Sequence, residues 1–464
     1  MTQSGDVKDR YLADFKAFVG NGAAGAPAWL KEIREGAIAR FARLGFPTMK
    51  QEEWRFTNVA PIAETRFALP QPGGSTRTAT PPPPAPTSRD ISRFLPRGAI
   101  RRQVVFVNGR YAAALSSVDG LPGGVRAGSL ADACKREVEL ARHHLGRYAG
   151  DAGNAFTALN TAFLDDGAFV DVAAGVVLQE PLHLVFVTVP LVPAPMVAHP
   201  RNLVIVGAGA SAILVESHIA LADGVYWTNA VTELVVGEGA RAEYCRVQRD
   251  SRDAYHVATT HAHQERDSVL ALHAITLGGA LARHDVQVVL AGRGGELVLN
   301  GLYLLGGRQH ADHHTVIDHA QPHCESHEYF NGVLDDQAHG VFNGRIIVRP
   351  GAQRTDSKQT NNNLLLSTEA RADSQPQLEI YADDVKCTHG STVGPADQNQ
   401  LYYLRSRGLS LEAARSLLTY GFGTEILSRM QAVEVRSQLD YLVRAWLARG
   451  GASGGGSADR RRVA

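Results

Sequence analysis

The sequence predicts a mainly β protein, with a parallel β-helix core flanked by N-terminal and C-terminal α-helical domains. Short runs rich in β-branched residues, each followed by a glycine-containing turn, recur through the middle of the 464-residue chain. Apolar residues at helical spacing occupy the segments on either side. Stacked rungs fit the repeated runs, because each rung buries its inward side chains only against its neighbours. A β-sandwich also contains several short strands and remains the structural alternative.

The first segment, residues 1–69, is predicted to be an N-terminal helical domain. Pro27 suits the first turn of a helix, and Gly45 with Pro47 ends the pattern. Between them, apolar residues recur at helical spacing, at Leu30, Ile33, Ala37, Phe41 and Leu44. Residues 50–58 are too mixed in character for periodicity to assign them.

Two segments are predicted to lie outside the packed domains. Residues 70–92 contain a proline-rich tract, which favours extended polyproline conformation and makes this stretch a linker. Residues 450–464 are dominated by Gly, Ser, Ala and Arg, a composition typical of a disordered tail.

Residues 93–394 are predicted to form the β-helix. Four pieces of this region combine a β-branched run with a glycine-containing turn, and they begin at Val204, Leu234, Val288 and Ile346. The first two Gly-x-Gly turns lie thirty residues apart, whereas the later spacings are looser. The sequence therefore predicts rungs with insertions between them.

Residues 395–449 are predicted to form the C-terminal helical domain. Asp397 can open one helix, Gly408 can close it, and Ser410 can cap the next. The expected apolar side of that second helix comprises Leu411, Ala414, Leu417, Leu418 and Phe422. Helical periodicity then continues over residues 426–446.

Composition excludes several classes of protein. The 47 basic residues balance 47 acidic ones, so we expect no nucleic-acid partner and no anionic membrane surface. The four cysteines form no Cys-x-x-Cys pair, which argues against a disulfide framework or a zinc ribbon. The first ten residues lack the apolar run of a signal peptide, and prolines interrupt the longest apolar stretch. These features predict a protein of the reducing cytoplasm.

Cys387 and His389 are the first candidate site. Thiolate and imidazole are good ligands for iron or zinc, and residues i and i+2 of an extended segment point to the same face. Two ligands are too few for a closed site, so a metal or cluster here needs further ligands, such as those of a second chain. The structural alternative is a buried thiol beside a hydrogen-bonded imidazole.

A histidine-rich run is the second candidate. It comprises His310, His313, His314, His319, His323, Cys324 and His327, with His339 beyond. The spacings match neither His-Glu-x-x-His nor a zinc finger, and in alternating strands these side chains cannot all converge. We favour a polar face of the β-helix with a few hydrogen-bonded core histidines over a mononuclear metal site.

Amide side chains are the third candidate. They are Asn343, Gln353, Gln359 and Asn361 to Asn363, and stacked amides form ladders in β-solenoids. A structural role is therefore expected of them. The sequence contains no phosphate-binding loop, nucleophile elbow or dinucleotide-binding glycine motif. In a nucleotide-driven process, another subunit would have to hydrolyse the nucleotide.

The segments that carry these residues resemble the SufB/SufD family. The similarity covers residues 340–346, 353–366, 377–387, 389–394 and 401–408, continues at 51–58 and 158–162, and is dense from about residue 300 to 425. Within the family the chain is most like the SufD branch, because Gly390 stands where the SufB branch typically has glutamate. The proline-rich linker and the arginine-rich tail depart from the family pattern.

The resemblance implies a right-handed β-helix and a non-catalytic scaffold for iron–sulfur cluster assembly. Members of the family pair as SufB with SufD through their β-helices, and each recruits the ATPase SufC through its C-terminal helices. The histidine matching His389 is implicated at the SufB interface, and Cys387 lies in the same motif. The resemblance thus implies a transient iron–sulfur cluster shared with a SufB-like partner. A homodimer is the arrangement considered for the isolated chain, and a flavin accompanies some complexes of this kind.

A β-solenoid enzyme that acts on a polysaccharide or an acyl donor is the alternative function. Such an enzyme needs acid and base groups that converge on one groove. Only scattered candidates such as Asp312 and Glu325 are present.

Overall fold

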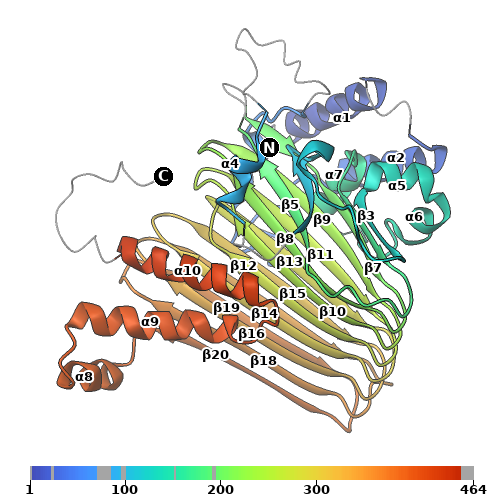
Figure 1. The fold of residues 1–464 in the computed structure, drawn as a ribbon. Helices are drawn as coiled ribbons and strands as arrows, with labels where there is room; N and C mark the ends of the chain where they lie inside the picture. The colour runs from blue at the N-terminus through green and yellow to red at the C-terminus, as the bar shows by residue number, and fades with distance from the viewer. Residues whose placement is uncertain are drawn as a thin grey trace.

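The fold is a β-solenoid of about seven turns with helices at both ends (Figure 1). This computed structural model describes residues 3–21, 26–70, 85–95, 101–150, 153–190 and 195–450. The predicted mainly β class, with helical segments flanking a solenoid core, is therefore confirmed.

Two long sheets form the walls of the solenoid, and each turn adds one strand to each sheet. The first sheet has the order β2 (Arg110–Tyr111), β1 (Arg102–Val107), β5 (Leu182–Thr188), β8 (Ser211–Ala220), β10 (Arg241–Arg249), β12 (Val269–Thr276), β14 (Glu296–Leu305), β16 (Glu325–Leu334), β18 (Asp356–Leu365), β20 (Lys386–Gly394). The second has the order β19 (Arg371–Ile380), β17 (His339–Val348), β15 (His310–His319), β13 (Leu281–Leu290), β11 (Tyr255–Gln264), β9 (Tyr226–Val236), β7 (Arg201–Val206), β4 (Ala168–Val172), β3 (Val125–Ser129), and β6 (Met196–Ala198) also pairs with β9. Pairing is parallel except at the N-terminal end, where β1 with β2 and β3 with β4 are antiparallel.

The four predicted repeat pieces are the ends of β7, β9, β13 and β17, which all lie in the second sheet. The last residues of its parallel strands form one register column: Val206, Val236, Gln264, Leu290, His319, Val348. Equivalent residues therefore recur once per turn. The strands β11 and β15 belong to the same series but end in the polar residues Gln264 and His319, so the apolar pattern did not reveal them.

The N-terminal helices cover the outer face of the second sheet. They are α1 (Gln3–Asn21), α2 (Ala28–Leu44) and α3 (Ala60–Glu64). As predicted, α2 begins after Pro27 and ends at Gly45, whose φ of +63° suits glycine. The unassigned stretch 50–58 contains a short 3₁₀ helix, η2 (Glu52–Trp54), and Trp54 is buried in the cluster that joins these helices to the sheet.

The predicted β-helix segment contains helices that the sequence pattern did not reveal. Between β3 and β4 lie α5 (Leu130–Arg136), α6 (Val138–His144) and α7 (Ala155–Ala162), and a 3₁₀ helix, η4 (Ala113–Leu115), follows β2. Helix α4 (Ser88–Ser92) lies inside the predicted linker and begins with a capping box between Thr87 and Asp90. Residues 71–84 of that linker and 451–464 of the predicted tail lie outside the described residues.

The C-terminal helices begin at the predicted caps. Helix α8 (Gln398–Ser406) starts at Asp397, whose side chain accepts from Asn399 N–H, and α9 (Leu411–Leu427) starts at Ser410, which accepts from Ala413 N–H. The continuous helix expected over 426–446 is wrong, because α9 ends at Leu427 and α10 (Val433–Gly450) begins after a break. Helices α9 and α10 pack on the outer face of the first sheet.

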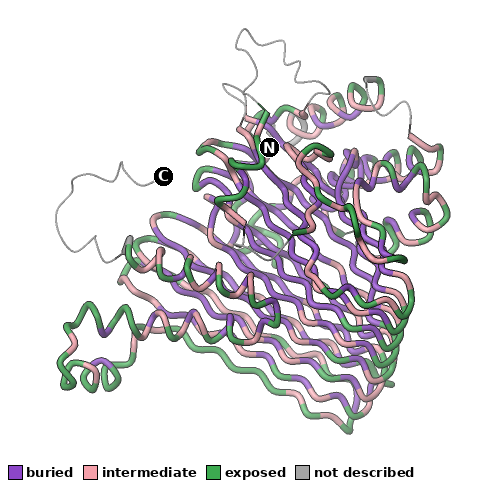
Figure 2. The backbone as a smooth tube through the Cα atoms, in the orientation of Figure 1, coloured by how far each residue is buried: buried purple, intermediate pink, exposed green. Residues whose placement is uncertain are grey.

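The expected apolar side of α9 is correct only in part. Ala414 is buried and Phe422 is half-buried, but Leu411 and Leu417 are 40% and 48% exposed. At the C-terminal end of α9, Ile426 and Leu427 are buried and pack against the first sheet. Figure 2 shows α8 and the adjoining part of α9 projecting from the solenoid with largely exposed backbone. Within the described ranges, no helix is long and apolar enough to cross a membrane.

Candidate functional site

Cys387 and His389 lie on β20, which is the last strand of the first sheet. The second sheet ends at β19, and no later strand of the described chain pairs with either one. Most residues of β20 are therefore exposed, although most strands of the preceding turns are buried (Figure 2). The candidate residues occupy the open end of the solenoid.

Both candidate side chains face the interior of this open end. Cys387 packs against the apolar core of the solenoid. Ser391 Oγ donates to Ser374 Oγ of β19 across 2.8 Å, so Ser391 faces the opposite sheet. Alternate residues of a strand share a face, and His389 lies between Cys387 and Ser391. The thiol and the imidazole are therefore presented together, as the i, i+2 spacing predicted.

A polar column lies beneath His389. Its backbone partner on β18 is Gln359, whose own partner on β16 is Glu328. Gln359 Nε2 donates to Glu328 Oε2 over 2.6 Å, and both side chains are fully buried. Burial raises the pKa of Glu328 to about 7. A carboxyl group that takes up a proton near neutral pH thus lies two rungs below the exposed imidazole.

A second polar column lies beneath Cys387. Its backbone partner is Ser357, and Ser357 Oγ lies 2.7 Å from Ser326 Oγ. His319 Nε2 lies 2.9 Å from the same Ser326 oxygen. Partial burial, with a contribution from the Asp356 carboxylate, raises the pKa of Cys387. The thiol is therefore mainly protonated at neutral pH, and a metal ion or cluster would have to stabilise the thiolate.

The donor set suits an iron–sulfur cluster as cargo. Thiolate and imidazole are both ligands that such clusters use. The two donors lie on one exposed strand, and the open end leaves room for ligands from another molecule. A side chain at Gly390 would also find space, because an added Cβ would meet no atom within 4 Å.

The histidine-rich run does not converge on one point. His310 Nε2 lies 2.9 Å from Thr57 Oγ1, and His314 lies between the carboxylates of Asp312 and Glu53. His313 stacks on the buried ring of Tyr303. Among the described residues, this run supplies no group of three ligands close enough to hold a metal ion. The interpretation as hydrogen-bonded core histidines therefore agrees with the structure.

Among the predicted amide residues that the structure describes, one bond joins two amide side chains on neighbouring rungs. Asn343 Nδ2 donates to Gln375 Oε1 over 3.3 Å between paired strands. Asn361 and Asn363 instead bond within their own strand and to Tyr303.

The acid–base pair considered for a solenoid enzyme is also separated. Asp312 is buried and lies 2.7 Å from Arg283, whereas Glu325 is exposed at the start of β16 in the other sheet.

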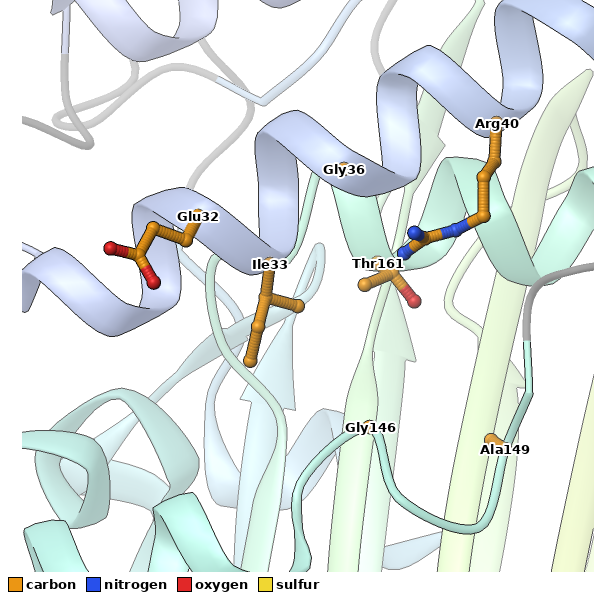
Figure 3. A pocket seen from close by; sticks show the side chains of 7 residues that line it. All are labelled: Glu32, Ile33, Gly36, Arg40, Gly146, Ala149 and Thr161. Atoms are coloured by element: carbon orange, nitrogen blue, oxygen red, sulfur yellow. The ribbon is translucent and has the colours of Figure 1, made fainter.

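A cavity of about 310 Å³ lies among the N-terminal helices, far from β20 (Figures 1 and 3). Its lining includes Glu32 and Arg40 of α2 and Thr161 of α7 (Figure 3). None of the predicted site residues lines it. The candidate site is therefore an open surface at the end of the solenoid.

The roles of Glu328 and Gln359 were missed at the sequence level. Gln359 lies one turn before His389 in the register column, and Glu328 lies one turn before Gln359. Counting one repeat backward from His389 would have found Gln359, and counting a second would have found Glu328, if the repeat length had been known at these rungs.

Comparison with known proteins gives the same family along most of the chain. Residues 191–422 match the SUF system FeS cluster assembly SufBD core domain, and residues 6–79 and 97–184 match the SufBD protein N-terminal region. An iron–sulfur cluster assembly SufBD family protein of Synechocystis is 32% identical over 422 residues, which cover 88% of this chain and 89% of the relative. The iron–sulfur cluster assembly protein SufD of Escherichia coli is 29% identical over 403 residues, which cover 87% of this chain and 89% of the relative. SufD of Bacillus subtilis is 29% identical over 297 residues, which cover 61% of this chain and 64% of the relative. The chain therefore belongs to the SufB/SufD family of iron–sulfur cluster assembly proteins, in which it is most like SufD.

Proposed function

We propose that this chain is a non-catalytic, SufD-like scaffold subunit that pairs with a SufB-like chain and recruits a SufC-like ATPase. The observation that carries the proposal is the open end of the solenoid, where Cys387 and His389 lie on the uncovered last rung. Two ligands on an uncovered strand form half of a cluster site. The cluster is transient cargo held between this chain and its partner.

The edges of β19 and β20 support pairing with a second β-helix. Each strand has a sheet neighbour on one side only, so its outer backbone groups are available for strand addition. Large apolar residues are exposed at the same end, namely Ile380, Tyr381 and Val393. A rung of similar geometry would cover these residues and bring its own ligands to His389. In the absence of that partner, the same edge favours a homodimer.

The C-terminal helices support recruitment of an ATPase. Tyr402 and Tyr403 of α8 are 77% and 57% exposed, and Leu417 of α9 is 48% exposed. Apolar surface on a projecting helical pair is typical of a protein-binding site. The sequence has no phosphate-binding loop, so nucleotide hydrolysis would belong to the bound subunit. All four cysteines are free thiols, which agrees with work in a reducing cytoplasm.

Co-expression with SufB and SufC homologues tests the proposal. We expect the three chains to purify together as a stable complex that accumulates an iron–sulfur chromophore. Isolation of this chain alone, from cells in which SufB and SufC form their own complex, would contradict it.

A further inference from the structure

Three metal-ligating side chains meet on the outer face of the first sheet, beneath the C-terminal helices. Glu243 and Cys245 lie two residues apart on β10, and His273 on β12 is the backbone partner of Cys245. One carboxylate oxygen, the thiol sulfur and one imidazole nitrogen all lie within 4.8 Å of one another. This cluster belongs neither to the open end of the solenoid nor to the histidine-rich run.

Two of the three donor separations are those of a tetrahedral metal site. Glu243 Oε1 lies 3.6 Å from Cys245 Sγ and 3.4 Å from His273 Nε2. Ligand bonds of about 2.0 to 2.3 Å at tetrahedral angles place the donor atoms about 3.3 to 3.7 Å apart. Both separations fall within this interval, and the third pair, Cys245 Sγ and His273 Nε2, lies within 4.8 Å.

Several buried polar atoms of the cluster have no hydrogen-bond partner. They include Glu243 Oε2 and His273 Nε2, although both side chains are almost fully buried. Buried polar atoms are normally paired, because an unpaired one costs about 1 to 3 kcal/mol. An ion held by both carboxylate oxygens of Glu243 and by the imidazole would satisfy both atoms.

Asn300 can hold the imidazole in the form that binds a metal. Its Nδ2 lies 3.2 Å from His273 Nδ1, while its Oδ1 is buried without a partner. If the amide is turned over, Oδ1 accepts from Nδ1–H, and the lone pair of Nε2 faces Glu243. An outer partner of this kind commonly orients a metal-bound histidine.

The cluster also lies at the junction of the last two helices. Glu243 Oε1 accepts from the backbone N–H groups of Gln431 and Ala432, which lie between α9 and α10. Cys245 packs in the same cluster as Ile426 and Val435. Without a cation, burial and the neighbouring Glu243 raise the pKa of Cys245 well above its usual range, so the thiol is neutral. The metal-free alternative is a thiol that donates to the carboxylate, with His273 Nε2 in contact with Glu243 Oε1 at 3.4 Å, but this arrangement leaves Glu243 Oε2 without a partner.

We propose that Glu243, Cys245 and His273 bind a divalent ion of the Zn²⁺ type, which fastens the α9–α10 junction to the solenoid. The nitrogen, oxygen and sulfur donor set suits Zn²⁺, and Co²⁺ can replace it as a spectroscopic probe. Binding releases the thiol proton, and the thiolate, the imidazole and the carboxylate then donate to the ion.

The test uses the full chain carrying Cys387→Ala and His389→Ala, so that these two residues at the open end cannot bind the added metal ion. We expect about one Zn²⁺ per chain after expression with zinc, a Tm that rises with added Zn²⁺, and a thiolate-to-cobalt charge-transfer band after Co²⁺ exchange. Adding Cys245→Ser or His273→Asn should abolish the band and the metal-dependent rise in Tm. Cys324→Ala, which changes a buried cysteine outside the cluster, should leave both unchanged.

Two results would overturn the proposal. One is a metal-free chain that folds but shows no change in Tm with Zn²⁺ and no cobalt–sulfur band. The other is retention of the ion by a folded Cys245→Ser or His273→Asn chain. The first needs no cluster variant, so misfolding of those variants leaves the test intact. Neither depends on SufB or SufC, so the metal site and the proposed scaffold function can fail separately.

Discussion

Gln359, one rung beneath His389, donates its side-chain N–H across 2.6 Å to the buried carboxyl group of Glu328, which lies one rung further down. The register column that ends at His389 thus becomes polar shortly before the solenoid opens to solvent. In the same register column, the two preceding positions are Leu272 and Leu299. Along this one column, the last rungs therefore carry polar and ionisable side chains where the two rungs before them carry leucine.

Replacement of Glu328 by glutamine should change the pH dependence of stability. Burial raises the pKa of Glu328 from 4.5 to about 7 in the folded protein, so between these values the folded state binds the proton more tightly than the unfolded state. The contribution of the protonated Glu328 side chain to the free energy of unfolding is fully present below about pH 4.5 and is lost as the pH rises to about 7. Relative to the native chain, Glu328→Gln should gain up to about 3 kcal/mol between about pH 5 and about pH 8.

Urea unfolding of both chains across this range measures the difference. Glu325→Gln is the control, because Glu325 is exposed on the same strand. Parallel stability curves for the native and Glu328→Gln chains would show that the carboxyl group is not held neutral.

Replacement of His389 by alanine should leave the fold and subunit assembly intact but lower cluster formation several-fold. The imidazole is exposed on the last rung, so its loss creates no buried cavity. The measurement is iron and sulfide content, with visible absorption, of the complex purified with SufB and SufC homologues. Thr388→Ala is the matched control on the opposite face of β20 and should behave as the native chain. An undiminished cluster yield in His389→Ala would remove the histidine from the site.

Alanine at Gly292 should destabilise the solenoid, whereas alanine at Gly351 should not. Both glycines lie in turns that follow strands of the second sheet. A Cβ at Gly292 would lie 2.0 Å from the backbone nitrogen of Arg266 in the neighbouring turn, but one at Gly351 would meet nothing within 4 Å. Because backbone cannot move aside cheaply, we expect a cost of about 1 to 3 kcal/mol or more for Gly292→Ala. For Gly351→Ala we expect a change within about 0.5 kcal/mol. Thermal melts that fail to separate the two variants would contradict the close packing of the turns.

Leu417→Asp should weaken recovery of the ATPase by at least several-fold without changing the melting temperature. The side chain is 48% exposed on α9, so a charge there costs little in the free chain but is unfavourable in an apolar interface. Val177→Asp is the matched control, since Val177 is 55% exposed at the other end of the solenoid. Pull-down of SufC with each variant gives the comparison. Equal recovery would place the docking surface elsewhere.

Local signals predicted much of the architecture. Helix ends at Gly45, Asp397 and Ser410 depend on capping groups within a few residues, and the sequence shows those groups directly. The rungs were visible where β-branched runs met glycine turns. Strands ending in Gln264 and His319 were hidden, because their polar residues occupy positions that are apolar in neighbouring rungs.

Features that depend on tertiary packing were not predictable in this way. Leu417 belongs to an apolar pattern, but periodicity cannot distinguish contact with the solenoid from contact with another subunit. Cys387 and His389 were found because one strand carries both. Glu328 and Gln359, by contrast, meet only when successive rungs are stacked. For the same reason, the sequence did not show that Glu243 and His273 lie close together, because they come from adjacent rungs.

The uncovered edges of β19 and β20 also have a consequence for the amount of this chain that a cell can make without its partner. An exposed rung can template addition by any strand of matching geometry, including that of another copy. Chains made in excess of their partner would therefore be prone to end-to-end association into unproductive oligomers. If the proposed complex forms, balanced synthesis of its subunits, or early capture of the newly folded chain, would keep this last rung free for its partner.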